Sequence, residues 1–157
     1  MLQSVFFWLR KNDREWLENM IYESHSAEET FEIGRKIGME ALPGTIICLD
    51  GDLGTGKTVF TKGVAAGLGI TEPVVSPTFT VVQIYEEGRL PLYHFDVYRI
   101  DDPDEMEEIG YRDYFYGEGI TIIEWSELIA ELIPEDAKRI VITKDTSKGF
   151  DYRQISM

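Results

Sequence analysis

The segment Gly51–Thr58, GDLGTGKT, is the feature that most constrains the fold of this 157-residue chain. It matches the pattern G-x-x-x-x-G-K-[S/T] at every fixed position, between an apolar run at 45–50 and a helical pattern at 59–68. In such a strand, loop and helix, backbone N–H groups and the positive end of the helix dipole surround a phosphate group. The sequence therefore predicts a phosphate-binding loop of the Walker A type.

The side chains of this loop indicate how it holds a nucleotide. Lys57 is expected to contact the β- and γ-phosphates, and the Thr58 hydroxyl to coordinate Mg²⁺, so ATP or ADP and Mg²⁺ are the predicted cofactors. A glycine turn that only caps a helix is the alternative interpretation. The predicted nucleotide contacts of the loop are Gly51, Asp52, Leu53, Gly54, Thr55, Gly56, Lys57, Thr58 and Val59.

Length and composition limit the class of protein. The length of 157 residues predicts one domain with a real core, over residues 20–157, and the hydrophobic fraction of 43% is ordinary for a soluble globular protein. Residues 1–19 are interpreted as an N-terminal extension, disordered or a short helix, and the apolar patch at 5–9 is too short to span a membrane. A net charge of −14 predicts little direct binding to nucleic acid or membrane. The single cysteine, Cys48, fits a reducing, cytoplasmic compartment.

The rest of the chain alternates between helical and strand patterns without an internal repeat. Two strand patterns, 78–85 and 90–100, flank a turn and predict an antiparallel hairpin, so the sheet is expected to be mixed. The predicted fold class is α/β, a P-loop NTPase-like three-layer sandwich with a mixed parallel and antiparallel central sheet. The other predicted elements are helices from Ser26 to about Leu42, at 101–108 and at 126–133, a short aromatic piece at 111–116, and strands at 119–124, 138–144 and 150–155.

Two of the predicted strands carry polar side chains that suggest a site. The two-residue period of a strand places His94, Asp96 and Tyr98 on one face. The apolar strand 120–124 ends in Glu124, which resembles a Walker B element, the usual second hold on Mg²⁺. The structural alternatives are a solvated strand face for the first pattern and a strand-end charge in water for the second.

The turn Ser76–Phe79, SPTF, precedes the hairpin and adds a weaker pattern. Its two hydroxyls on a proline-fixed turn suggest a loop that senses the γ-phosphate, so Thr78 joins the predicted cofactor-binding residues, although Ser-Pro also marks an ordinary turn. Arg99 lies three residues after Asp96 and is expected on the opposite strand face, so it is not predicted to be an arginine finger. Trp125 has two interpretations, a core residue or an interface aromatic.

Taken together, GDLGTGKT, SPTF, HFDVYR at 94–99 and EW at 124–125 resemble the TsaE family, formerly YjeE, from about Ser26 to Ile142. The resemblance implies a small bacterial P-loop ATPase required for threonylcarbamoyladenosine at position 37 of tRNAs that read codons beginning with A. It implies TsaB and TsaD as partners, with TsaD transferring the threonylcarbamoyl group and the ATPase resetting or regulating that machine. Contact with tRNA would then occur only through the complex.

The resemblance also implies roles for individual residues. Thr58 and Glu124 are implied as Mg²⁺ ligands, and Asp96 as a carboxylate that either binds metal or activates the attacking water. The segment that contains Ser26 and Glu29 is implied to border the adenine, although the same spacing predicts a helix capping box. The predicted catalytic residues are Lys57, Asp96 and Glu124.

Two other functions fit a Walker A motif in a chain of this size. A small-molecule kinase usually needs an arginine-rich lid over its acceptor, and this chain has only 15 Lys and Arg residues and no arginine-rich segment after its core. A nucleotide-sensing adaptor would bind ATP without turnover. Because no arginine finger is predicted, an ATPase of this kind is expected to be slow alone and faster with its partners.

Overall fold

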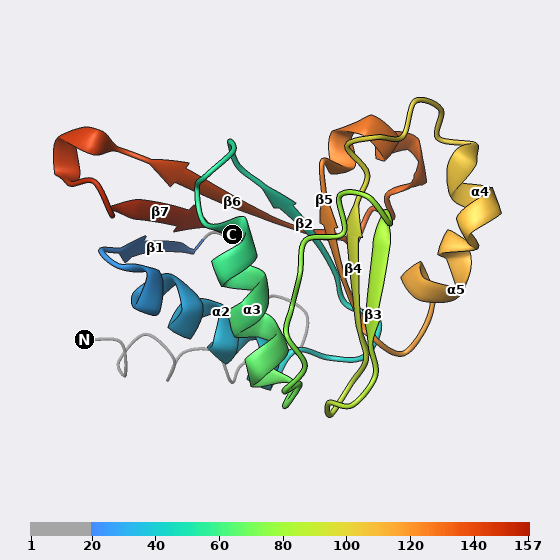
Figure 1. Ribbon diagram of the computed structural model, residues 1–157, viewed down its shortest axis with the longest axis horizontal. Helices are drawn as coiled ribbons and strands as arrows, with labels where there is room; N and C mark the ends of the chain where they lie inside the picture. The colour runs from blue at the N-terminus through green and yellow to red at the C-terminus, as the bar shows by residue number, and fades with distance from the viewer. Residues whose placement is uncertain (1–19) are drawn as a thin grey trace.

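The computed structural model describes residues 20–157, and the predicted N-terminal extension, residues 1–19, lies outside the described residues. Within that range the strands form one mixed sheet in the order β1-β7-β6-β2-β5-β4-β3 (Figure 1). The central strand β2 runs parallel to β5 and β6, and β4 runs parallel to β5, whereas β3, β7 and β1 pair antiparallel. The strands are β1 Ile21–Ser24, β2 Ile46–Asp50, β3 Val82–Tyr85, β4 Leu92–Asp96, β5 Ile120–Glu124, β6 Lys138–Lys144 and β7 Arg153–Ser156.

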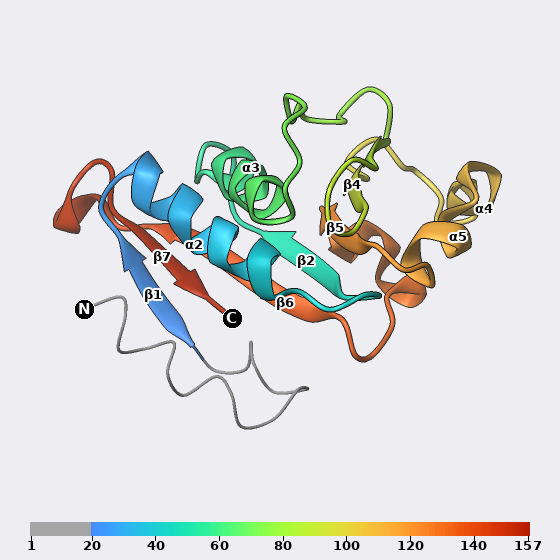
Figure 2. The same cartoon turned by 90° about the horizontal axis from the view of Figure 1, so that it is seen from below.

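Helices cover both faces of this sheet (Figure 2). Ile47 and Leu49 of β2 pack in one core with α2 and α3, while Ile46, which points the other way, packs in a second core with α4, α5 and η2. The predicted three-layer α/β fold with a mixed sheet is therefore confirmed. No helix within residues 20–157 is long and apolar enough to cross a membrane. The helices are α2 Ala27–Glu40, α3 Lys57–Gly67, α4 Glu105–Ile109, α5 Tyr111–Phe115 and the 3-10 helices η2 Ser126–Leu132 and η3 Thr146–Lys148.

The central parallel strands bring functional positions to one edge of the sheet. All five residues of β5 are buried, and β2 is buried except for its last residue, as expected for strands covered on both faces. Cys48 belongs to this core, and burial raises the pKa of its thiol, so it packs as a small apolar group. Along the sheet, Leu49 is paired with Glu124, and Glu124 with Asp96. The carboxyl ends of β2, β5 and β4 therefore lie side by side.

The helix that follows the loop is fixed by close packing against α2. A Cβ atom at Gly63 would lie 2.1 Å from the carbonyl oxygen of Phe31, and one at Gly67 would lie 2.0 Å from that of Arg35. Only glycine allows the two backbones to approach this closely. Because α3 begins at the Gly51–Thr58 loop, this contact also fixes the position of that loop over the sheet.

The predicted capping box at the start of α2 is confirmed with one difference. The N–H of Glu29 donates to Ser26 Oγ at 3.1 Å, which satisfies one free donor of the first turn. The carboxylate of Glu29 accepts from the N–H of His25 at 2.8 Å, one residue before the position that a capping box usually serves. The side chain of Glu29 is thus hydrogen-bonded to the backbone at the start of the helix.

Both strands of the predicted hairpin are shorter than the sequence indicates. β3 begins only at Val82, because the chain before it turns: Val81 has a left-handed φ of +67° and its N–H donates to the Pro77 carbonyl at 2.7 Å. β4 ends at Asp96, and the N–H of Ile100 then donates to the Val97 carbonyl at 3.0 Å in a second turn. The antiparallel pairing of the two strands is confirmed.

Other predicted elements differ at their ends. The predicted helix 101–108 begins only at Glu105, and the last predicted strand begins at Arg153 rather than at residue 150. The predicted helix 126–133 is a 3-10 helix with a kink at Ile129, where φ is −126°. The sequence did not predict β1, which pairs with β7 at the edge of the sheet.

Candidate nucleotide-binding and catalytic site

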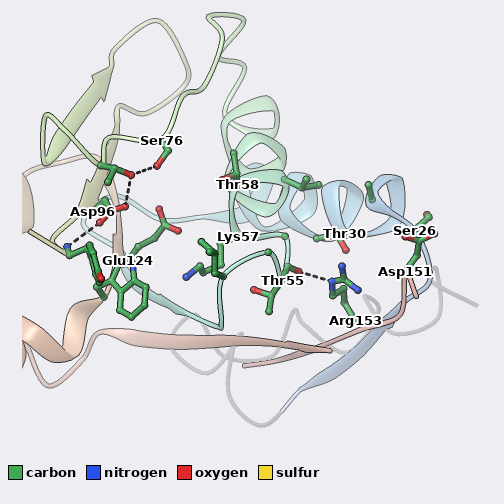
Figure 3. Close-up of a pocket in the computed structure, with 18 residues that line it drawn as sticks. Ser26, Thr30, Thr55, Lys57, Thr58, Ser76, Asp96, Glu124, Asp151 and Arg153 are labelled. Carbon is green, nitrogen blue, oxygen red and sulfur yellow. Dashed lines mark hydrogen bonds between the residues drawn. The ribbon is translucent and has the colours of Figure 1, made fainter. Parts of the chain in front are cut away.

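A cavity of about 700 Å³ lies over the carboxyl ends of the central strands and collects residues from distant parts of the sequence (Figure 3). This is the position at which open α/β sheets bind ligands. Its volume is within the range of small-molecule and cofactor sites. The residues that line it are Ser26, Ala27, Thr30, Leu53, Gly54, Thr55, Gly56, Lys57, Thr58, Val59, Ser76, Thr78, Asp96, Tyr98, Glu124, Trp125, Asp151 and Arg153.

The predicted phosphate-binding loop forms the middle of this cavity, between β2 and α3. Gly54 and Gly56 have φ of +76° and +101°, which residues with a Cβ rarely adopt. Gly56 is the N-cap of α3 and provides no side chain to bond the free N–H groups of the first turn. Those N–H groups and the dipole of this 11-residue helix therefore favour an anion at the loop.

Lys57 and Thr58 follow the glycines at the start of α3, and both line the cavity. The Nζ of Lys57 donates to the carbonyl oxygen of Gly51 at 2.6 Å and lies 4.9 Å from the ring centre of Trp125. Lys57 is thus held within the loop, with its side chain at the wall of the cavity. The predicted positions of the loop side chains are thus compatible with phosphate binding.

Two buried carboxylates form one end of the cavity. Asp96 ends β4 and Glu124 ends β5, the two positions are paired in the sheet, and each residue is only 5% exposed. The solvated alternatives for His94, Asp96 and Glu124 are therefore wrong, since His94 is also fully buried. Tyr98, by contrast, lies beyond the end of β4 and is 59% exposed, although it lines the same cavity.

A hydrogen-bond chain connects the SPTF turn to Asp96. Ser76 Oγ lies 2.9 Å from Thr78 Oγ1, which donates to Asp96 Oδ2 at 3.2 Å. The N–H of Tyr98 donates to Asp96 Oδ1 at 3.0 Å. Both oxygens of Asp96 thus accept a hydrogen bond, and the two hydroxyls of the turn reach the cavity next to the buried acids (Figure 3).

Trp125 and Arg99 fall in different surroundings. Trp125 has a left-handed φ of +63° directly after Glu124, and its ring is half-buried, lines the cavity and lies 4.9 Å from the ring of Tyr98. It is thus neither simply core nor simply an exposed interface residue. The guanidinium of Arg99 lies 4.4 Å from the ring centre of Phe79 and does not line the cavity.

Residues from the two ends of the described chain form the opposite end of the cavity. Ser26, Ala27 and Thr30 come from the start of α2, and Asp151 and Arg153 come from the segment that enters β7. Of these, only Ser26 was among the predicted site residues. The others have no local motif. The packing of α2 on α3 and the pairing of β7 with β6 and β1 bring them to the loop.

Arg153 is tied to the loop itself. Its Nε donates to the carbonyl oxygen of Thr55 at 2.8 Å, and its Nη1 donates to the carbonyls of Phe150 and Tyr152 at 3.0 and 2.7 Å. Hydrogen bonds from a charged guanidinium are stronger than those between neutral groups. Arg153 therefore holds the Gly51–Thr58 loop against the C-terminal strand.

Three predicted nucleotide contacts lie outside the cavity. The carboxylate of Glu29 faces the backbone of His25, so the structure does not bring it to the site. Gly51 and Asp52 line a neighbouring hollow on the other side of the loop, together with Arg139, whose guanidinium pairs with Asp50. Val59 and Thr78 line the cavity as predicted.

The donor set of the cavity suits a cation that is shared with a phosphate. Residues 20–157 contain no group of three or more His, Cys, Asp or Glu side chains that could hold a metal alone. Mg²⁺ usually takes only one or two protein carboxylates and completes its shell with phosphate oxygens and water. Thr58, Asp96 and Glu124 line the same cavity as the loop, so these residues fit Mg²⁺ that arrives with a nucleotide.

Comparisons with known proteins agree with this architecture. The family model described as "Threonylcarbamoyl adenosine biosynthesis protein TsaE" matches residues 24–155. The tRNA threonylcarbamoyladenosine biosynthesis protein TsaE of Bacillus subtilis (strain 168) is 45% identical over 140 residues, 89% of this chain and 85% of that protein. The protein of the same name from Treponema pallidum (strain Nichols) is 45% identical over 112 residues, 71% of this chain and 82% of that protein.

A solved structure gives the same result. The crystal structure of Bacillus subtilis YdiB matches with a TM-score of 0.75 and 41% sequence identity, over 88% of this chain and 84% of that chain. The family match also extends past Ile142, where the resemblance of the motifs ended, and includes Arg153. The chain therefore belongs to the TsaE family, which takes part in the biosynthesis of threonylcarbamoyladenosine in tRNA.

Proposed function

We propose that this chain is a Mg²⁺-dependent ATPase that acts with TsaB and TsaD in the threonylcarbamoylation of adenosine 37, in tRNAs that read codons beginning with A. The observation that carries the proposal is the shared cavity, in which Lys57 and Thr58 of the phosphate-binding loop meet the buried acids Asp96 and Glu124. Family membership supports the pathway, and the cavity supports the chemistry.

The triphosphate of ATP would lie along the loop, with its γ-phosphate toward the two acids. Lys57 would exchange its contact with the Gly51 carbonyl for the β- and γ-phosphate oxygens and offset the charge that spreads over them in the transition state. Thr58 and Glu124 would hold Mg²⁺, which would supply positive charge to offset that of the phosphates.

Asp96 is the residue best placed to orient the attacking water. Its two oxygens accept hydrogen bonds from Thr78 and from the N–H of Tyr98, so a water that replaces the Thr78 hydroxyl would find an acceptor already fixed by the backbone. The water oxygen then bonds to the γ-phosphorus, the bond to the ADP oxygen breaks, and the water proton passes to Asp96 or to the released phosphate.

The ATPase is proposed to be slow alone and to regulate or reset the TsaB–TsaD transferase in the cytoplasm. Among the residues that the structure describes, Lys57 and Arg153 are the cationic side chains of the cavity, and Arg153 is held by three carbonyls at the end away from the acids. A partner that supplied a further cation near Asp96 and Glu124 would therefore accelerate hydrolysis.

Phosphate release from ATP, measured for the chain alone and with TsaB and TsaD, tests the proposal. Slow release that increases with the partners is expected. Transfer of the γ-phosphate to a metabolite instead of water would indicate a kinase. Partner binding that depends on ATP without any phosphate release would indicate an adaptor without turnover. Either result would replace the ATPase proposal.

Direct tRNA binding gives a separate test of the partner requirement. Affinity for a polyanion comes largely from cations that neutralise phosphates, and this chain carries a net charge of −14. The isolated protein should therefore bind tRNA negligibly in a filter-binding assay at physiological salt, and binding should require TsaB and TsaD. Tight, salt-sensitive binding by the protein alone would contradict an indirect role.

A further inference from the structure

His94 is a buried polar residue to which neither the loop nor the proposed mechanism assigns a role. It lies in the middle of β4 and is fully buried. Its Nε2 lies 2.9 Å from Oε2 of Glu124, whose side chain is 7% exposed, while its Nδ1 is buried without a hydrogen-bond partner among residues 20–157. The imidazole therefore makes one polar contact, and that contact is to a proposed Mg²⁺ ligand.

The direction of this hydrogen bond follows from the chemistry of the two groups. An ionised carboxylate only accepts, so Nε2 carries the hydrogen and donates to Glu124 Oε2. Burying a ring nitrogen without a partner costs free energy, and a leucine of similar size would avoid this cost. A histidine at this position is thus explained better by its contact with Glu124 than by packing alone.

The sheet register places His94 behind Glu124. Asp96 is paired with Glu124 across β4 and β5, and His94, two residues earlier on the same face of β4, is paired with Ile122. His94 therefore approaches the carboxylate from within the sheet, on the side away from the strand ends. The carboxylate can then present its other oxygen, Oε1, to the cavity that Glu124 lines.

The two acids of the cavity are held in different ways. Asp96 is fixed through both oxygens, by Thr78 and by the N–H of Tyr98. For the carboxylate of Glu124, His94 provides the one hydrogen bond found within the described part of the chain. Without it, the three side-chain torsions of Glu124 would be constrained by packing alone.

We propose that His94 is a positioning residue that holds Glu124 Oε2 and thereby aims Oε1 at Mg²⁺. The inference rests on the proposed function, because it requires Glu124 to bind Mg²⁺. Hydrogen bonds to a metal ligand from outside the coordination shell fix its orientation, and their loss typically weakens metal affinity by about 10- to 100-fold. His94 itself does not line the cavity, so it should act on Mg²⁺ and not on the nucleotide.

The test measures ADP affinity by calorimetry with saturating Mg²⁺ and again in EDTA, and the ratio of the two affinities gives the Mg²⁺ linkage. His94→Leu should reduce this linkage by about tenfold or more and leave the EDTA affinity unchanged. His94→Gln, whose amide nitrogen can occupy the place of Nε2, should retain most of it. Thr121→Val is the matched control, because Thr121 is a buried polar residue of β5 whose hydroxyl bonds the Tyr114 carbonyl instead.

The outcomes separate this inference from the proposed function. If Glu124→Gln leaves the linkage unchanged, Glu124 is not a Mg²⁺ ligand. The metal-binding role of Glu124 in the proposed function and the positioning role of His94 are then both contradicted. If Glu124→Gln loses the linkage while His94→Leu keeps it, only the positioning role is overturned. Equal losses in His94→Leu, His94→Gln and Thr121→Val would also overturn it, because they would indicate a general packing defect.

Should His94→Leu fail to fold, the pair His94→Asn and His94→Gln gives the same decision. The shorter asparagine places its amide near the position of Nδ1 and cannot reach Glu124, whereas glutamine can. A linkage lost in His94→Asn and kept in His94→Gln supports the proposal. Equal linkages in the two variants contradict it.

Discussion

At one end of the cavity the functional side chains stand on neighbouring strands in the middle of the sheet, whereas at the other end they come from residues 26–30 and 151–153. The end that contains Asp96 and Glu124, here called the acid end, is fixed by the parallel register that pairs these two residues. The opposite end combines the start of α2, which packs on α3, with the segment that enters β7, which pairs with β6 and β1 near the edge of the sheet.

This difference suggests a division of labour along the bound nucleotide. The acid end contains the groups that suit a metal and an attacking water, so it should determine the rate of hydrolysis. The end formed by α2 and β7 contains Ser26, Thr30 and the loop-holding Arg153, so it should determine affinity. Variants at the two ends should therefore change different kinetic constants.

The largest effect is expected at Lys57, which lies between the two ends and serves both. Lys57→Ala should abolish productive ATP binding and hydrolysis while the melting temperature stays close to wild type, because the side chain contacts the loop and not the core. Nucleotide calorimetry, phosphate release and thermal melting test this prediction. Lys62→Ala, on the exposed side of the same helix, is the matched control. Normal turnover in folded Lys57→Ala would contradict the phosphate-binding loop.

Asp96→Asn should show the role of the acid end alone. The amide keeps the size of the side chain and loses its charge and basicity, so ATP binding should survive while the turnover rate falls by at least about tenfold. Single-turnover phosphate release and nucleotide affinity are the measurements, and Asp101→Asn, at an exposed acid outside the cavity, is the control. Normal hydrolysis would mean that another group, such as Glu124 or a partner residue, handles the water.

Most of the acid end could be predicted from the sequence, because its signals are local. The loop pattern, the alternation that pairs His94 with Asp96 and the acid that ends β5 each lie within eight residues. The end formed by α2 and β7 could not be predicted in the same way. β1 is only four residues long and pairs with a strand 129 or more residues away, and Arg153 reaches the loop through a hydrogen bond to Thr55, 98 residues earlier in the chain.

The errors at strand ends have a related cause. The residues before β3 are rich in Thr and Val, which favour strands, yet the chain turns there and Val81 has a left-handed backbone. The N–H of Val81 donates to the Pro77 carbonyl, and the Val81 carbonyl accepts from the N–H of Asp96. The same turn brings Thr78 to Asp96. The local departure from strand propensity is therefore part of the acid end and could not be read from propensity alone.

Arg153→Gln tests the opposite end of the cavity. Loss of the guanidinium contact with the Thr55 carbonyl should leave the loop less ordered before ATP binds, so ATP affinity should fall by about tenfold. The turnover rate at saturating ATP should change little, because Arg153 does not contact the acid end. Titrations of rate against ATP concentration separate the two constants. Arg35→Gln, which removes a half-buried arginine paired with Glu32 outside the cavity, is the control. A lower turnover rate with unchanged affinity would contradict the division between the ends.

The smallest effect is expected at Glu87, which anchors the loop that carries Ser76 and Thr78 to the acid end. Its carboxylate accepts hydrogen bonds from the N–H of Glu72 at 2.7 Å and from the hydroxyl and N–H of Thr71. These bonds hold the pKa of Glu87 below its usual range, and the bond from the N–H of Glu72 contributes most. Because the folded pKa lies below the unfolded one, the stabilisation is present above roughly pH 4.3 and is lost as the pH falls through the lower folded value.

Glu87→Gln keeps an acceptor oxygen but removes the charge, so it should lower the melting temperature at pH 7 by roughly 1–3 °C. The gap from wild type should close as the pH falls through the lowered pKa of Glu87, because the wild-type side chain then also becomes neutral. Thermal melting of both proteins from pH 7 to pH 3 measures this gap, and Glu86→Gln, at the exposed neighbour, should show none. A gap that persists unchanged at pH 3 would mean that the loop is anchored by the shape of the side chain and not by its charge. The charge of Glu87 would then contribute nothing to holding the loop that carries Thr78 to Asp96.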